Sequence, residues 1–289
     1  MDIRVRPVIG GLVSFVPGAY DLWDRMRPMG DYRPPEYGRD ILVQRLADAR
    51  AAGADPVLGT VVELGPGRSL SGPIGALLEG AERAVGLDAA AYATVEENLR
   101  VVDALTAEAG VGAARAEALR DAVRNATTAG PESALWYRAP WNDADVMPPG
   151  SVDFIWSISA LEHVTNPSAI YRACFQWLRP GGIMVHKIDF SSHQFTKKWN
   201  GHYWVPNWIW RIAIGREDRY SINRLPPSGH REIAGAAGFD ILAENPTHAG
   251  DPEDPFYAAP PVPQFRGLDR SELFVRTCTF IMRKPATPG

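Results

Sequence analysis

The clearest chemical signal in the chain is the segment 63–67, which reads Glu-Leu-Gly-Pro-Gly. It follows a run of β-branched and apolar residues, so it is predicted to form the loop after a buried strand. The two glycines let a ligand approach the backbone closely, and Glu63 places a carboxylate beside that ligand. Because a carboxylate repels phosphate, the loop suits a cationic or amino-bearing ligand. A tight turn that holds no ligand is the alternative interpretation.

A dinucleotide site is not predicted, although its fingerprint also places a glycine-rich loop after a strand. That fingerprint, Gly-x-Gly-x-x-Gly, would need a third glycine at position 70, where the chain has leucine. A second acid, Asp88, ends the next predicted strand, 25 residues after Glu63. A carboxylate at that place can bind ribose hydroxyls. This second acid favours a ligand site over an empty turn.

Two histidines and an aspartate follow the predicted fourth and fifth strands. His163 lies just past a strand at 152–157, Asp189 lies at the end of a strand at 183–190, and His193 comes shortly after it. The carboxyl edge of a parallel sheet is where ligands bind, so these side chains could accept a proton from a hydroxyl or bind it. A structural hydrogen-bonding role is the alternative for each.

A metal site is the sharper alternative for His186, Asp189 and His193, because such side chains can hold a divalent ion that acidifies a hydroxyl. Residues 186 and 189 differ by three along a strand, however, and therefore point to opposite faces of the sheet. A solvated or core histidine is favoured, and no metal site is predicted.

The elements that must position these residues alternate along the chain. Short β runs and helical patterns follow one another from residue 60 to residue 190, which is typical of an α/β fold with an open parallel sheet and helices on both faces. Asn166-Pro167 predicts the start of a helix and Arg179 to Gly182 its end. The predicted strands are 60–64, 84–87, 134–138, 152–157, 183–190, 239–244 and 274–283.

These segments resemble, in order and spacing, the class I S-adenosylmethionine-dependent methyltransferases of the small-molecule branch. The resemblance covers about residues 58–190 and rests on Glu-x-Gly-x-Gly at 63–67, on Asp88, on SVDFIWSISALEHV at 151–164 and on LRPGG at 178–182. The flank INRLPPSGHREIAGAAGF at 222–239 is similar to a bacterial subgroup often associated with sugar or surface-glycan methylation.

The resemblance implies S-adenosylmethionine as the cofactor. Its methionine moiety would lie beside the glycine loop and its ribose against Asp88. Asn142 or Asp143 would meet the adenine amino group, and Trp141 would stack on the ring or serve as a packing residue. The implied cofactor-binding residues are Glu63, Gly65, Pro66, Gly67, Asp88, Trp141, Asn142, Asp143 and Ser157.

The implied reaction requires the acceptor to be aligned with the sulfonium, and a hydroxyl acceptor must also lose its proton. His163 is the leading candidate for the base, followed by Asp189 and His193. We expect methyl transfer to a hydroxyl of a small molecule, such as a sugar, a glycan or a natural product. Two alternatives remain: a nicotinamide-dependent sugar oxidoreductase or epimerase, and a non-catalytic scaffold with the same fold.

The resemblance also suggests four regions and a Rossmann-like, seven-stranded, mostly parallel sheet. An aromatic-rich segment after the fifth strand holds eight of the 28 aromatic residues between positions 190 and 220. Aromatic faces suit a sugar or an apolar acceptor, and a small core of the insert's own is the alternative. The predicted regions are an N-terminal helical cover (1–57), a cofactor-binding core (58–190), an acceptor-binding insert or lid (191–230) and a C-terminal completion of the sheet (231–289).

Composition limits the remaining function classes. The formal net charge of −4 argues against a nucleic-acid binder that relies on a general basic field. No apolar run is long enough to span a bilayer. Two cysteines cannot form a disulfide framework, so a cytoplasmic location is expected. Residues 8–18, behind Arg4 and Arg6, are interpreted as a short amphipathic segment that packs on the domain and could also touch a membrane surface.

Overall fold

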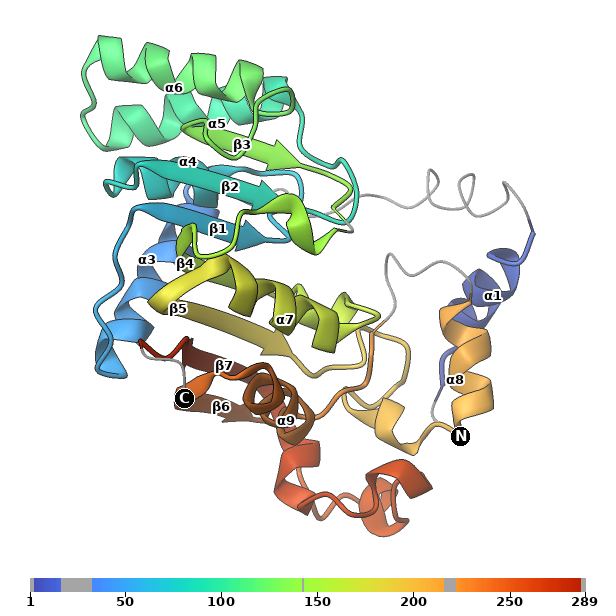
Figure 1. Cartoon of the computed structure of the whole chain (residues 1–289). Helices are drawn as coiled ribbons and strands as arrows, with labels where there is room; N and C mark the ends of the chain where they lie inside the picture. Colours follow the sequence, from blue (N-terminus) through green and yellow to red (C-terminus); the bar gives the residue numbers. More distant parts are fainter. Residues whose placement is uncertain (1–2, 17–32, 142, 216–221, 287–289) are drawn as a thin grey trace.

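A seven-stranded sheet forms the centre of the protein in a computed structural model, which describes residues 3–16, 33–141, 143–215 and 222–286. The strand order is β3-β2-β1-β4-β5-β7-β6 (Figure 1). Strands β1 to β5 are parallel, and β7 is antiparallel to both β5 and β6. The strands are β1 (Thr60–Leu64), β2 (Arg83–Leu87), β3 (Leu135–Arg138), β4 (Val152–Ile158), β5 (Leu178–Asp189), β6 (Asp240–His248) and β7 (Val275–Arg283). The predicted fold class is confirmed.

Helices cover both faces of this sheet. Successive strand residues point to opposite faces, so Val61 and Trp156 pack in the core under α3 to α6, whereas Val62 and Ile155 pack in the core under α7 and α9. The α-helices of the described residues are α1 (Val5–Val13), α3 (Tyr37–Ala51), α4 (Ser71–Leu78), α5 (Val95–Glu108), α6 (Ala113–Asn125), α7 (Pro167–Trp177), α8 (Asn207–Ile214) and α9 (Pro227–Ala237). The 3₁₀ turns are η1 (Ala144–Val146), η2 (Leu161–His163), η3 (Gly201–Trp204), η5 (Pro255–Ala258), η6 (Pro263–Phe265) and η7 (Arg270–Phe274). None of these helices is long and apolar enough to cross a membrane.

Local signals set most of the boundaries. The side chain of Asn166 accepts a hydrogen bond from the N–H of Ala169 and caps α7, as predicted. Residues 179–182, which are predicted to end this helix, form part of the beginning of β5 instead, because α7 already ends at Trp177. There the register with β4 shifts between Val152 and Phe154, which lets the chain pass from helix into strand without a separate loop.

Within the predicted N-terminal helical cover, residues 5–13 form α1. Gly10 and Gly11 lower the helix propensity by about 1 kcal/mol each, which hides the helix in the sequence pattern. Packing against α8 compensates for this cost: a Cβ on Gly11 would lie only 1.9 Å from the backbone oxygen of Ile212. Helix α1 therefore covers the insert, and α3 covers the sheet.

The aromatic residues of the insert mostly form cores of their own. Tyr203 packs with aromatic residues of 257–274, and Trp210 packs with Val205 and Ile209. Trp208 is 67% exposed. The insert is thus a small folded unit at the carboxyl end of the sheet rather than an open aromatic surface (Figure 1).

Two uncharged histidines lie in the core between the sheet and α7 and α9. His186 Nδ1 lies 2.8 Å from Ser157 Oγ, and His230 Nδ1 lies 3.1 Å from the hydroxyl of Tyr171. Burial lowers the pKa of His186 to about 3, and burial together with the nearby His186 lowers the pKa of His230 to about 3. Between about pH 3 and the reference value of about 6.5, only the unfolded chain binds a proton at these sites, so their contribution to stability falls as the pH falls.

We expect His230→Gln to flatten the pH dependence of folding stability. Glutamine does not titrate, so the slope of the unfolding free energy should decrease by about 1.4 kcal/mol per pH unit between pH 6 and 4.5. Urea unfolding at a series of pH values measures this slope. The exposed His248→Gln is the control and should leave it unchanged. Equal slopes for His230→Gln and the wild type would contradict the buried neutral state.

Candidate active site

The glycine loop leaves β1 at the carboxyl edge of the sheet. Gly65 and Gly67 have φ angles of +74° and +68°, a region that side chains rarely adopt. A Cβ on Gly65 would lie 2.9 Å from the Cβ of Ala160, whereas a Cβ on Gly67 would meet no atom within 4 Å. Gly65 is therefore required by packing, and Gly67 keeps the backbone open beside the loop.

Asp88 ties this loop to the end of β2. Its carboxylate accepts hydrogen bonds from the N–H groups of Gly67 and Ala89, each at 2.7 Å. Burial raises the pKa of Asp88, and these hydrogen bonds oppose that rise. Gly67 and Asp88 are 21 residues apart in the sequence, and the parallel pairing of β1 with β2 brings them together.

Glu63 is the second buried acid of this loop. It is 5% exposed, and its Oε2 has no hydrogen-bond partner among the described residues. Burial raises the pKa of Glu63 well above its usual value, the charge of Asp88 adds to the rise, and Arg33 opposes it. A Cβ on Gly72 would lie 2.1 Å from Glu63 Oε2, so this position needs glycine. Two close, buried carboxyl groups, one without a partner, fit a positively charged ligand.

The structure places Ser157 and the residues predicted to contact the adenine in different surroundings. The N–H of Trp141 donates to the backbone oxygen of Asp88 at 3.1 Å, which places this segment beside the end of β2. The ring of Trp141 packs against Trp177, with 5.2 Å between centroids. Asp143 is exposed and caps η1 by accepting from the N–H of Asp145. The prediction for Asn142 lies outside the described residues. Ser157 is fully buried, and its hydroxyl contacts His186 rather than the edge of the sheet.

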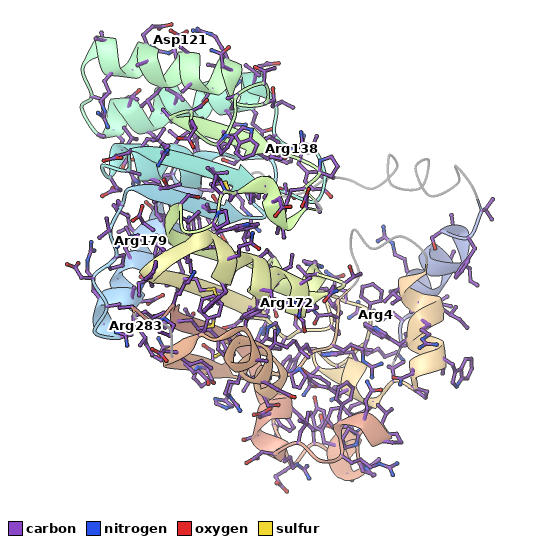
Figure 2. All side chains as sticks on the ribbon, in the orientation of Figure 1. Arg4, Asp121, Arg138, Arg172, Arg179 and Arg283 are labelled. Carbon is purple, nitrogen blue, oxygen red and sulfur yellow. The ribbon has the colours of Figure 1, made fainter. Side chains whose placement is uncertain are left out.

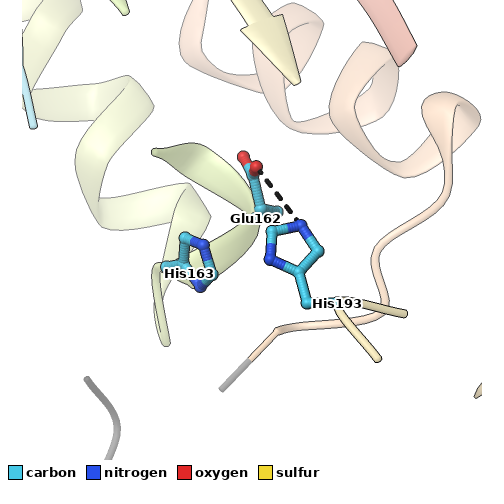
Figure 3. A group of neighbouring side chains, drawn as sticks. All are labelled: Glu162, His163 and His193. Atoms are coloured by element: carbon cyan, nitrogen blue, oxygen red, sulfur yellow. Dashed lines mark ion pairs between the residues drawn. The ribbon is translucent and has the colours of Figure 1, made fainter. Parts of the chain in front are cut away.

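A group of imidazole and carboxyl side chains gathers where β4 and β5 end (Figure 3). Turn η2 supplies Glu162 and His163, and the chain after β5 supplies His193. The two imidazole rings meet edge to face with 4.8 Å between centroids. His193 Nε2 lies 3.8 Å from Glu162 Oε1 and 3.6 Å from Asp189 Oδ2. All three predicted catalytic residues therefore lie at one edge, where Asp189 contacts His193.

Backbone strain accompanies this group. Ser159, just before η2, has φ +49°, and His193 and Gln194 have φ +46° and +68°. Non-glycine residues adopt such angles at a cost of about 1–3 kcal/mol each, and the surrounding packing must hold them there. Positive φ in both segments that form the cluster is a reason to regard it as a functional site.

The pKa values of the two carboxyl groups at the cluster, Glu162 and Asp189, are shifted in opposite directions. Glu162 is 3% exposed, and neither carboxyl oxygen has a hydrogen-bond partner among the described residues. Burial raises the pKa of Glu162 to about 8, and the charge of Asp189 contributes. Burial also raises the pKa of Asp189, but contacts with His193 and with the N–H of Ser191 outweigh it and hold that pKa below its usual value. Glu162 therefore remains protonated near neutral pH, whereas Asp189 remains charged.

Glutamate and histidine are also residues that hold metal ions. One ligand atom from each of Glu162, His163 and His193 lies within 4.8 Å of the others. His186, which the alternative metal set included, lies in the core beside Tyr171 and outside this group.

Asn223 is a positioning residue that the sequence patterns did not single out. Its N–H donates to the backbone oxygen of Glu162 at 2.8 Å, and its side-chain Nδ2 donates to the oxygens of Leu161 and Val164 at 2.8 and 3.0 Å. The next residue, Arg224, is buried, has φ +59° and donates to the oxygen of Val205 in the insert. Together they fasten η2 to the insert. The sequence carries one signal for these two residues: at 222–225, Asn223 and Arg224 stand as a polar pair between two apolar residues.

Comparisons place the chain among known proteins. A family model described as a methyltransferase domain matches residues 36–244. An S-adenosylmethionine-dependent methyltransferase from Mesorhizobium loti has 20% identity and a TM-score of 0.40 over 82% of this chain and 96% of its own. A phosphoethanolamine N-methyltransferase from Haemonchus contortus, solved with S-adenosylmethionine, has 14% identity and a TM-score of 0.48 over 92% of this chain and 59% of its own. The [4+2]-cyclase SpnF has 14% identity and a TM-score of 0.44 over 90% and 86%. No curated protein matches the sequence.

We expect Asn223→Leu to destabilise the fold by about 2–4 kcal/mol, because it leaves two carbonyl groups of η2 without their donor. Urea unfolding measures the change. Asn125→Leu is the matched control: this asparagine is exposed on α6, and its replacement should cost less than about 0.5 kcal/mol. A similar cost for the two variants would contradict the assignment of Asn223 as the residue that holds η2.

Proposed function

Because this chain belongs to the methyltransferase domain family, we propose that it transfers a methyl group from S-adenosylmethionine to a hydroxyl of a small molecule, such as a sugar, a glycan or a natural product. The cofactor is S-adenosylmethionine, which the Haemonchus relative also binds. The observation that carries the proposal is the pair of buried carboxyl groups at the glycine loop. Glu63 offers the ammonium and sulfonium charges its Oε2, which has no hydrogen-bond partner among the described residues, and Asp88 offers its carboxylate to the ribose hydroxyls.

The beginning of α4 supports this cofactor over a nicotinamide dinucleotide. A pyrophosphate binds to free N–H groups at the start of the helix after the glycine loop. Here the N–H of Leu70 donates instead to the side chain of Asn98 at 2.6 Å. Glu63 nearby would also repel a phosphate. Both features argue against the oxidoreductase alternative. The buried carboxyl groups of Glu63 and Asp88 at the glycine loop argue against a scaffold that binds no ligand.

The cofactor supplies an electrophilic methyl carbon. An acceptor hydroxyl held in line with this carbon would lose its proton to the protein as it is methylated. His163, Asp189 and His193 are the residues we assign to this step, since all three lie at the edge where β4 and β5 end. His163 is the proposed proton acceptor. His193 lies against its ring, and Asp189 holds His193.

We expect Asp88→Ala to weaken S-adenosylmethionine binding by about 1–3 kcal/mol, or roughly 5- to 150-fold in Kd, because the ribose hydroxyls lose their acceptor. Isothermal calorimetry on the folded variant measures the change. Asp121→Ala, on the exposed face of α6, is the control and should bind normally. An unchanged Kd for Asp88→Ala would contradict the ribose assignment, and absence of wild-type binding would contradict the proposed function.

We expect His163→Ala to lower the methylation rate by about 10²–10⁴-fold and to leave cofactor affinity nearly unchanged. S-adenosylhomocysteine formed with a panel of hydroxyl-bearing sugars and natural products reports the rate. His163→Gln keeps a polar side chain but accepts no proton at neutral pH, so it should be equally slow. The exposed His248→Gln should be as fast as the wild type. A fast His163→Gln would make His163 a positioning group.

Treatment with a chelator is the second check on this assignment. The same cluster could instead hold a divalent cation that lowers the pKa of the acceptor hydroxyl, since both buried oxygens of Glu162 lack a hydrogen-bond partner among the described residues and lie beside two imidazoles. With His163 as the proton acceptor, EDTA should leave the rate unchanged. Loss of activity with EDTA and its return with added Mn²⁺ or Zn²⁺ would overturn the proton-acceptor role.

A further inference from the structure

Helix α1 presents large apolar side chains to solvent. Val5, Ile9 and Leu12 are 73%, 45% and 53% exposed, and Val16 beyond the helix is 55% exposed. Their spacing of four and three residues puts Val5, Ile9 and Leu12 on one face of α1. Phe15 adds a fifth exposed apolar side chain at 48%. Single exposed apolar residues are ordinary, but a continuous row of them indicates a binding surface.

The opposite face of α1 consists of small residues packed against α8. A Cβ on Gly11 would lie within 3 Å of the backbone of Ile212 and Ala213, and a Cβ on Gly215 would lie 2.1 Å from Ser14 Oγ. Helix α1 thus buries its small residues and exposes its large ones, whereas α8 buries Ile209 and Trp210 in the insert and exposes Trp208. A helix pair that faces water buries its large apolar side chains. Small residues between helices and large apolar residues outside are the arrangement that lipid favours.

Helix α8 contributes to the same part of the molecule. It lies beside α1 at the periphery, beyond the carboxyl end of the sheet (Figure 1). Its Trp208 is 67% exposed, and tryptophan is enriched where proteins meet the headgroup layer of a bilayer. The N–H of Arg4 donates to the oxygen of Phe195 at 2.8 Å, and Ile3 bridges to Thr196, so the start of α1 is fixed to the insert.

The two described segments that carry α1 and α8 are basic. Segments 3–16 and 190–215 contain no aspartate or glutamate, although the whole chain carries a net charge of −4. Figure 2 shows Arg4 beside the α1 and α8 pair. The exposed basic residues of the two segments include Arg4, Arg6, Lys197 and Arg211. An apolar surface with a basic rim is complementary to a bilayer with anionic headgroups.

We propose that α1 and α8 form a docking surface that binds the anionic surface of a lipid bilayer. The apolar row of α1 enters the headgroup layer, and the arginines contact the anionic lipids. The nine residues of α1 span about 14 Å, so the helix lies on the bilayer rather than crossing it. A second copy of the chain is a poorer occupant, because a symmetric contact would bring the arginines of the two copies together without an acid of these segments to pair with them.

This inference does not depend on the proposed function, but it has a consequence for it. Residues 194–206 connect His193 directly to α8. Phe195, two residues after His193, accepts a hydrogen bond from the N–H of Arg4 at the start of α1. This contact joins the cluster to the docking surface and favours an acceptor that is attached to a lipid.

Vesicle sedimentation tests the docking surface. We expect the wild-type chain to bind vesicles of phosphatidylcholine mixed with phosphatidylglycerol, to bind phosphatidylcholine vesicles at least ~10-fold more weakly, and to be released by high salt. Leu12→Asp should reduce binding to the anionic vesicles by about 10-fold or more. Arg6→Gln, which changes only the basic rim, should reduce it several-fold.

Matched controls keep the test specific. Val43→Asp and Val57→Asp replace apolar residues that are 43% and 50% exposed elsewhere on the chain, and they should bind the vesicles like the wild type. Circular dichroism should show every variant folded. Absence of wild-type binding to anionic vesicles overturns the proposal, as does an equal loss of binding in the Val43 and Val57 variants. Failure to sediment together with a dimer that Leu12→Asp dissociates would assign the surface to a second copy.

Discussion

The burial of three carboxyl groups beside a half-buried fourth, along one edge of the sheet, is the constraint on which the site depends. Glu63, Asp88, Glu162 and Asp189 follow or end β1, β2, β4 and β5, and the parallel topology brings them to the same edge. Burying a charged carboxylate is costly unless hydrogen bonds or positive charge compensate it. Asp88 receives two backbone N–H groups and Asp189 an imidazole, whereas Glu63 Oε2 and both carboxyl oxygens of Glu162 have no hydrogen-bond partner among the described residues.

Several backbone features make sense as supports for these acids. Gly72 leaves room for the carboxyl of Glu63, and Asn98 occupies the N–H of Leu70 at the start of α4, so that no anion competes for the loop. Asn223 holds the turn that carries Glu162 to the segment that closes the insert. The insert is therefore part of the construction of the cluster, because the same stretch of chain fixes η2 on one side and reaches Val205 through Arg224 on the other.

The sequence predicted those parts of the site that depend on local chemistry. Two glycines after an apolar strand and an acid after the next strand require no knowledge of the fold, and the parallel sheet then brings the loop and Asp88 together. The contacts of Glu162 with His193 and of Asn223 with η2 join residues from 31 to 62 positions apart, and no spacing rule reports them. The bounds of α1 within the predicted helical cover were not predicted for a different reason: its glycines weaken the helical pattern, and only tertiary packing on α8 makes them favourable.

The unpartnered acids also link the site to stability. A carboxyl whose pKa is raised in the folded state keeps its proton where the unfolded chain has lost it, so its contribution to stability declines as the pH rises from about 4.5, through a pKa of about 8 for Glu162. The buried histidines act in the opposite direction. A positive charge placed beside Glu63 lowers the folded-state pKa of that carboxyl and removes the corresponding loss. The binding free energy of a cationic cofactor therefore includes the removal of the electrostatic penalty that burial imposes on the Glu63 carboxyl. Gly72 and the glycine loop leave the space in which a positive charge can approach this carboxyl.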